Sequence, residues 1–235
     1  MVIISRFRKY KEIILRRVLW LFFPIKITKY NYGVLKLVDL NMSFIPKKII
    51  NQESVIYSFG AGEDIHWEVE LIRKYGCEIF LFDPTPRSFE HFDKLYRNSI
   101  LKKNFHSPAL KITYDATEEI MEKISFSKIA LYNKNTMVKF YKPKNPLDVS
   151  HSITNNQDTV SFIDVQAKHL SSIMNSFNHK YIDYLKLDIE GAEYMVVEDI
   201  VNNNIDIKVI CLEYHYSNDL NAFENVKRLY NSLNT

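Results

Sequence analysis

The sequence is 235 residues long and 46% hydrophobic, which is enough apolar material to bury the core of one folded domain, so a largely disordered chain is excluded. The net charge of +3 is unevenly distributed, because residues 1–30 carry eight Lys or Arg and one Glu, a charge of +7, and the remaining residues carry −4. An acidic body argues against nucleic acid as a partner.

The first predicted element is a basic amphipathic helix over residues 3–23. Apolar side chains recur there at helical spacing, with basic residues in most of the gaps: Ile3, Phe7, Tyr10, Ile14, Val18 and Leu21. Its uninterrupted apolar run, residues 18–23, is far shorter than the ~20 residues of a membrane span. Two interpretations stay open: residues 1–29 make a peripheral contact with an anionic membrane, or the arm covers a sheet edge or a second subunit of a homo-oligomer. We therefore divide the chain into this helix with its lead-in, residues 1–50, and a main domain, residues 51–235.

A strand, a glycine turn and a helix are predicted next. Residues 55–59 are a short apolar run that Gly60-Ala61-Gly62 interrupts, and apolar side chains then recur at helical spacing at Ile65, Val69 and Ile72. Glycine lacks a Cβ atom, so its backbone can lie against a ligand at the carboxyl edge of a parallel sheet, where open α/β folds bind ligands. The turn predicts a ligand site that includes its neighbours Phe59 and Glu63.

A second strand, residues 78–82, ends at Asp83-Pro84. A carboxylate in this place can accept hydrogen bonds from both hydroxyls of a ribose, so we expect a nucleoside-containing ligand. A dinucleotide would require a third glycine where this chain has Ile65, and a helix start without the acids Glu63 and Asp64. Two carboxylates instead suit the ammonium and sulfonium of S-adenosylmethionine. The structural alternative is a pair of ordinary turns in a domain without a ligand.

The middle of the chain predicts further elements around one long polar loop. Helices are expected over residues 88–96, with Ser88 as cap, 115–124 and 169–177, and strands over 126–131, 136–141 and 159–165. The loop over residues 142–157 contains His151 and Ser152. Long loops in compact domains are usually functional or disordered, so this loop is either the acceptor-binding segment or a disordered polar loop.

A second informative stretch runs from residue 181 to 201. It predicts a buried strand over residues 182–189 and a helix over 191–201, but Lys186 and Asp188 interrupt the apolar run of the strand. Because a buried charge is costly unless it is paired, we expect Asp188, at the carboxyl end of the strand, to line the ligand cleft. The structural alternatives are a helix-capping role for Asp188 and an ion pair of Lys186 with Glu190 or Glu193.

The last predicted strand, residues 207–212, is followed directly by Glu213, Tyr214 and His215, and a final helix is expected over residues 221–233. In the usual sheet order 3-2-1-4-5 this strand lies beside the one that ends at Asp188. Asp188, Glu213 and His215 are then expected to converge. Such a trio suits either a divalent metal or general base catalysis, although a His after a strand is often an ordinary loop residue.

These segments resemble the FkbM-type methyltransferase family: SFGAGED with FDPTPRS, ALYNKNTMVKFYKP with VSHSI, and LKLDIEGAE followed by LEYHY. The resemblance covers about residues 54–215. It implies an α/β fold of the class I, Rossmann-like type, with a mostly parallel sheet and helices on both faces. It also implies contact of S-adenosylmethionine with Gly60, Gly62 and Asp83, active-site positions at Asp188 and near Glu213 and His215, and methylation of hydroxyls on sugars or natural products. An evident C-terminal β-hairpin, usual in class I enzymes, is lacking, so either the arm or a second subunit covers the sheet edge, or the site closes over the substrate in a different way.

We therefore expect an S-adenosylmethionine-dependent O-methyltransferase that acts on a sugar hydroxyl of a glycan. The acceptor hydroxyl needs a base, for which His215 or Asp188 is expected, with Glu213 orienting it; a bound metal would lower the pKa of the hydroxyl instead. The alternatives are a methyltransferase for a small natural product or a protein side chain, and a non-catalytic scaffold docked at a membrane. Cys77 and Cys211 lie in or beside apolar runs, which favours reduced core thiols and a cytoplasmic location.

Overall fold

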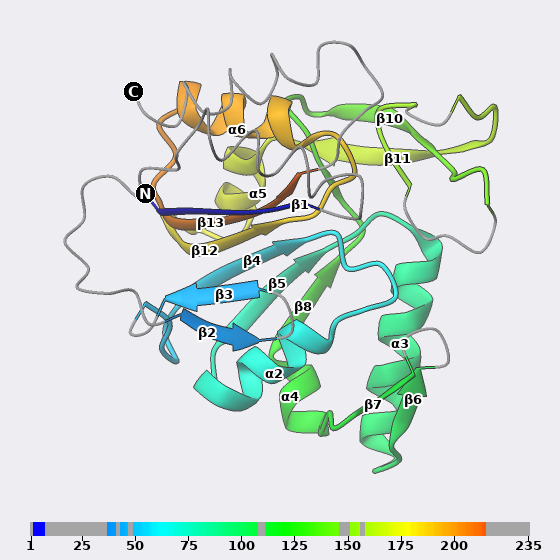
Figure 1. Ribbon diagram of the computed structural model, residues 1–235, viewed down its shortest axis with the longest axis vertical. Helices are drawn as coiled ribbons and strands as arrows, with labels where there is room; N and C mark the ends of the chain where they lie inside the picture. Colours follow the sequence, from blue (N-terminus) through cyan, green and yellow to red (C-terminus); the bar gives the residue numbers. More distant parts are fainter. Residues whose placement is uncertain are drawn as a thin grey trace.

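A computed structural model describes residues 2–7, 37–40, 43–46, 49–107, 111–145, 151–155 and 158–214 (Figure 1). Its centre is a six-stranded sheet in which every neighbouring pair is parallel. The strands lie in the order β1 (Val2–Phe7), β13 (Ile207–Tyr214), β12 (Ile182–Leu187), β4 (Val55–Phe59), β5 (Glu78–Phe82) and β8 (Ile124–Ser127). Without β1 this is the predicted order 3-2-1-4-5, and the predicted bounds of β4 and β5 are confirmed to the residue.

Helices cover both faces of this sheet, as the sequence predicts. One face carries α2 (His66–Tyr75), α3 (Pro86–Ile100) and α4 (Glu118–Glu122), and the other carries α5 (Leu170–Ser176) and α6 (Glu193–Asn202) (Figure 1). The predicted cap of α3 is wrong by three residues: the Thr85 hydroxyl accepts from the Ser88 backbone N–H, and Pro86 opens the helix because its missing N–H is not needed there. None of the helices among the described residues is long and apolar enough to cross a membrane.

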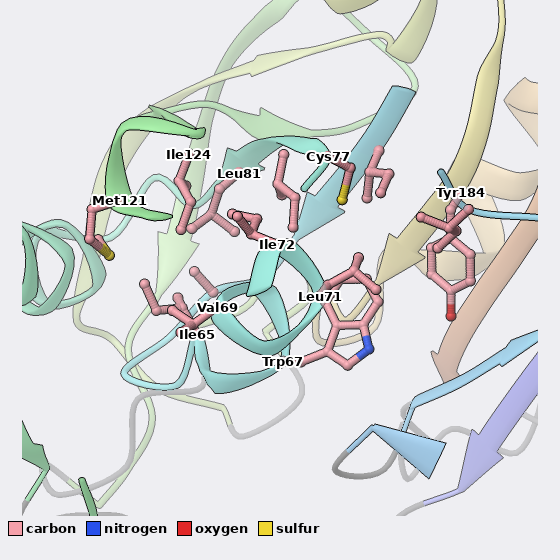
Figure 2. Close-up of a cluster of buried hydrophobic side chains, with 14 of the residues drawn as sticks. Ile65, Trp67, Val69, Leu71, Ile72, Cys77, Leu81, Met121, Ile124 and Tyr184 are labelled. Atoms are coloured by element: carbon pink, nitrogen blue, oxygen red, sulfur yellow. The ribbon is translucent and has the colours of Figure 1, made fainter. Parts of the chain in front are cut away.

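The alternation of side chains along each strand produces two cores. Ile56 and Tyr184 point into the cluster under α2, whereas their neighbours Tyr57 and Leu185 point into the cluster under α5 and α6. Figure 2 shows the first cluster, where Trp67 and Tyr184 lie with ring centroids 5.5 Å apart. Each fully buried large side chain of this kind stabilises the fold by about 2 kcal/mol.

The two cysteines belong to the first of these cores. Cys77 and Cys211 are both buried, and neither forms a disulfide bond. Burial raises the pKa of the Cys77 thiol to about 11, so this group stays protonated at neutral pH.

A second, three-stranded sheet lies beside the carboxyl edge of the first (Figure 1). Its central strand β11 (Phe162–Lys168) pairs antiparallel with β10 (Thr136–Tyr141), as predicted for residues 136–141, and parallel with β9 (Ala130–Leu131). The single strand predicted over residues 126–131 is wrong, because the chain turns after Ser127 and divides it between β8 and β9. The strand predicted over 159–165 lies three residues later. The stretch without clear periodicity after α3 contains a small antiparallel pair, β6 (Phe105–Ser107) and β7 (Ile112–Tyr114).

The predicted N-terminal helix is wrong for its first residues. Residues 2–7 form β1, which pairs in parallel with β13 from Val209 to Tyr214. An open strand edge presents unpaired N–H and C=O groups, and the apolar, partly β-branched start of the chain satisfies them. The arm therefore covers the sheet edge at this place; residues 8–36, like the helix predicted over 221–233, lie outside the described residues. In the lead-in, β2 (Leu37–Leu40) and β3 (Ser43–Pro46) form an antiparallel pair beside α2.

Candidate active site at the carboxyl edge of the sheet

The glycine turn after β4 is in direct contact with the end of β12. Gly60 has a φ of +87°, and a Cβ atom at this position would lie 1.8 Å from the carbonyl oxygen of Asp188. Main-chain hydrogen bonds fix the approach, since the N–H of Gly60 donates to Phe82 O at 3.0 Å and that of Asp188 donates to Phe59 O at 3.1 Å. The missing Cβ of Gly60 thus admits the backbone of Asp188, so the two predicted stretches meet at one point.

Gly60→Ala is expected to lower the free energy of unfolding by about 3 kcal/mol, because it combines a left-handed φ with a main-chain clash. Gly76→Ala is the matched control: Gly76 also has a positive φ, +69°, but the nearest atom to its added Cβ is Gln52 Cγ at 3.8 Å. For Gly76→Ala we expect the free energy of unfolding to fall by only about 1 kcal/mol, from backbone strain alone. Urea denaturation measures both values, and equal losses would contradict the close approach at Gly60.

Asp83 joins the glycine turn to the start of α3. Its side chain is buried, and Oδ2 accepts the N–H of Gly62 at 2.9 Å while Oδ1 accepts the N–H and the hydroxyl of Thr85 at 2.8 and 2.6 Å. The rings of Phe59 and Phe82, which precede the two turns, are stacked with centroids 4.4 Å apart. The turn after β4, which contains Ala61, and the turn after β5, which contains Pro84, are therefore held together by the contacts of Asp83 and of the two rings. These turns contain most of the residues that are predicted to bind the cofactor.

The two acids before α2, which we expect to suit a positively charged ligand, have different surroundings. Glu63 forms an ion pair with Arg87 of α3, with Oε2 and Nη2 2.8 Å apart. Asp64 accepts hydrogen bonds from the N–H of His66 at 3.0 Å and the hydroxyl of Tyr114 at 3.4 Å. Burial, with the charge of Asp64, raises the pKa of Tyr114 well above its usual range, so the hydroxyl stays a donor. The hydrogen bonds that Asp64 and Asp83 accept thus come from neutral groups, not from a cation.

A buried ion pair lies directly beneath the turn. Glu68 of α2 is fully buried, and its Oε1 accepts the hydroxyl of Ser58 at 2.7 Å and the ammonium of Lys186 at 3.0 Å. The predicted partners of Lys186, Glu190 and Glu193, are therefore wrong. Burial alone would lower the pKa of Lys186, but the charges of Glu68 and Asp188 outweigh it and hold the pKa above its usual value, so the ammonium stays charged.

Sequence reasoning missed Glu68, although a signal was present. This acid is three residues after Ile65 and four before Ile72, so it lies on the apolar stripe of α2 rather than on its polar side. A carboxylate in such a place requires a buried partner. Lys186, which interrupts the apolar run of the predicted strand, carries the positive charge that Glu68 requires.

Asp188 is the first residue after β12 and opens a turn that leads into α6. Leu187 pairs with Leu212, so the residues that follow, Asp188 and Glu213, lie on neighbouring strands at the carboxyl edge. The N-cap residue of α6 is Ala192, which excludes the alternative of Asp188 as the cap. His215, the third residue predicted here, lies outside the described residues. Within those residues no group of three or more His, Cys, Asp or Glu side chains could hold a metal ion, so the structure does not support the predicted metal.

The predicted acceptor loop reaches the same turn from the second sheet. His151 stacks on Phe140 with ring centroids 6.0 Å apart. Ser152 forms a β-bridge with Tyr141, and its hydroxyl donates to the carbonyl oxygen of Glu190. No sequence pattern predicts this contact with Glu190, because any residue can supply a main-chain carbonyl.

One pocket of about 290 Å³ lies away from these residues. It is lined by residues at the amino ends of the strands, among them Val55, Glu78, Lys123 and His179. It is therefore on the opposite edge of the sheet and is no part of the candidate site.

Comparisons with known proteins agree with this arrangement. The family model described as "Methyltransferase FkbM domain" matches residues 58–233, which include both turns and Asp83. The chain is 28% identical over 163 residues to the human "Probable methyltransferase-like protein 24", an alignment that covers 67% of this chain and 31% of that protein. It is 24% identical over 159 residues to the rat protein of the same name, with the same shares, so the chain spans about a third of the length of these relatives. No solved structure matches the chain. Because the family model covers most of the sequence and both halves of the site, the chain belongs to the FkbM methyltransferase family.

Proposed function

We propose that the protein transfers the methyl group of S-adenosylmethionine to a hydroxyl oxygen of a saccharide. The observation that carries the proposal is the junction of three elements at the carboxyl edge: Gly62 bonded to Asp83, and Gly60 packed on Asp188. Open α/β folds bind ligands at this edge, where strand ends and helix starts meet. Family membership supports methyl transfer, and the geometry supports the place of the donor.

The residues present fit such a donor. An ionised carboxylate has about four acceptor positions. In Asp83, one bond from Gly62 and two from Thr85 use three of them. Oδ2 of Asp83 can therefore accept a ribose hydroxyl without releasing the glycine turn. Asp64 and Asp83 favour a ligand with positive charge, and S-adenosylmethionine, when bound, supplies a methyl group activated by a sulfonium.

The chemistry then requires a base at the acceptor oxygen. An alcohol is barely ionised at neutral pH, so Asp188 takes the hydroxyl proton as the carbon–oxygen bond forms and the carbon–sulfur bond breaks, which leaves S-adenosylhomocysteine. Glu213, on the neighbouring strand, orients the reacting groups, and His215 is the second candidate base. Most of the acceleration comes from holding the oxygen in line with the methyl group.

Asp83→Ala is expected to raise the Kd for S-adenosylhomocysteine by tenfold or more, because a hydrogen bond to a charged acceptor contributes about 1.5–3 kcal/mol. Isothermal titration calorimetry measures this directly. Asp115→Ala removes the same charge from a side chain that is 82% exposed and outside the site, so its Kd should stay within twofold of the wild type. Equal affinities of the two variants would contradict the role of Asp83.

An acceptor screen tests the substrate class. The full chain is incubated with S-adenosylmethionine labelled in the methyl group and with separate panels of oligosaccharides, small hydroxylated natural products, and peptides. We expect label on oligosaccharides, in an ether bond that survives mild alkali. Label on peptides alone, or on small natural products alone, would contradict a saccharide acceptor and identify that class as the acceptor instead.

A further inference from the structure

The turn after Asp188 has a backbone conformation that side-chain-bearing residues rarely adopt. Glu190 has a φ of +52° and Gly191 a φ of +100°. A left-handed conformation at a residue other than glycine costs about 1–3 kcal/mol and persists only where its surroundings hold it in place. Two sets of contacts do so here, one on each side of the peptide between these residues.

The first contact comes from α6 itself. Glu193 is almost fully buried, and both of its carboxylate oxygens accept the N–H of Gly191, at 3.1 and 2.9 Å. This fixes the nitrogen of the peptide.

The second set comes from the loop after β10 and fixes the carbonyl oxygen. The hydroxyl of Ser152 donates to Glu190 O, and that of Thr154 lies 3.5 Å from the same oxygen. The two hydroxyls are 2.8 Å apart, and the N–H of Thr154 donates to Ser152 Oγ at 3.1 Å. Ser152 is itself held by main-chain hydrogen bonds with Tyr141 of β10, at 2.8 and 3.1 Å. The hydroxyls of Ser152 and Thr154 therefore connect the end of β10 to the turn that contains Glu190.

We propose that Ser152 and Thr154 are positioning residues that hold the Asp188–Gly191 turn in its reactive shape. The inference rests on the proposed function. It replaces the expectation from the sequence that the loop with Ser152 binds the acceptor directly, since the Ser152 hydroxyl donates to Glu190 O and acts on the acceptor through the turn. The donor side is built from other contacts, at Gly60, Gly62 and Asp83. Loss of the hydroxyls should therefore impair chemistry while donor binding persists.

The variants are Ser152→Ala, the double variant with Thr154→Val, and Ser152→Thr, which keeps the hydroxyl. Thr159→Val is the matched control, because the Thr159 hydroxyl also donates to a main-chain carbonyl, Lys142 O at 2.8 Å, in the same region but away from the turn. Amide hydrogen exchange of the peptide that contains Glu190 to Ala192 reports the shape of the turn and needs no substrate. We expect exchange to be at least tenfold faster in the double variant and unchanged in Thr159→Val. Equal protection in all variants would overturn the inference.

Kinetics separate positioning from a general loss of structure. We expect kcat with the labelled oligosaccharide acceptor to fall about 10- to 100-fold in Ser152→Ala, as misplacement by about 1 Å can do, and to recover in Ser152→Thr. The Kd for S-adenosylhomocysteine should stay within twofold. An unchanged kcat, or a Kd that rises as much as kcat falls, would contradict the assignment. If the wild-type protein does not bind S-adenosylhomocysteine, the proposed function is contradicted. The exchange experiment would then still decide whether the two hydroxyls hold the turn.

Discussion

Asp188→Asn is expected to lower kcat by about a thousandfold, because asparagine keeps the shape of the side chain but cannot accept the hydroxyl proton, and a positioned base contributes about 10²–10⁴-fold. The contact of position 188 with Gly60 is made by main-chain atoms, so the fold around the glycine turn should persist. The Kd for S-adenosylhomocysteine should change by less than threefold. Single-turnover methyl transfer measures the chemical step, and calorimetry measures the affinity.

Asp206→Asn is the matched control for this experiment. Asp206 is an exposed acid just before β13, at the amino edge of the same sheet, and its substitution removes the same charge. We expect wild-type kcat in the control. A kcat for Asp188→Asn within threefold of the wild type would contradict Asp188 as the base, and a wild-type protein that binds the donor but modifies no acceptor would favour the scaffold alternative.

Loss of one partner of the Glu68–Lys186 pair should have the largest effect on stability. Lys186→Met leaves the fully buried carboxylate of Glu68 without its cation, and breaking a buried pair in this way costs about 3–5 kcal/mol. Replacing both residues by methionine should recover most of the loss, because no uncompensated charge remains. Urea denaturation measures each value, and a double variant no more stable than the single one would contradict this explanation.

The pH dependence of the same pair has a defined sign. The pKa of Lys186 is raised in the folded protein, so its contribution to stability is complete below the unfolded lysine pKa, about 10.4, and is lost only as pH rises through the folded value. The difference between wild type and the variant with methionine at both positions, in which neither charge of the pair remains, should therefore be constant from about pH 6 to 9. The exposed pair of Asp93 and Arg97, 3.0 Å apart on α3, is the control, and Arg97→Met should cost at most about 1 kcal/mol.

The β-α-β unit and the sheet order could be predicted because their signals are local. A short apolar run changes to helical spacing at Gly60, Gly76 ends the helix, and Asp83-Pro84 ends the next strand. Chain order and the usual crossover rules then place five of the strands. The signal for the strand end at Asp188 is also local, because Lys186 and Asp188 are the polar residues near the carboxyl end of an apolar run.

The rest depends on contacts between residues far apart in sequence. Lys186 pairs with Glu68, 118 positions away, although four acids lie within seven residues of it. The helical spacing of residues 3–23 competes with an open edge on β13, and pairing with that edge decides the structure of residues 2–7. The contact of Ser152 with Glu190 uses a main-chain carbonyl, for which no sequence pattern exists.

Calorimetric titration of the full chain with S-adenosylhomocysteine tests the central claim most directly, namely that the junction of Gly60, Gly62, Asp83 and Asp188 is a methyl-donor site. We predict saturable binding at one site per chain that Asp83→Ala weakens by tenfold or more and Asp115→Ala leaves unchanged. Absence of heat with S-adenosylhomocysteine, together with saturable binding of a nicotinamide dinucleotide or a nucleoside triphosphate, would contradict it.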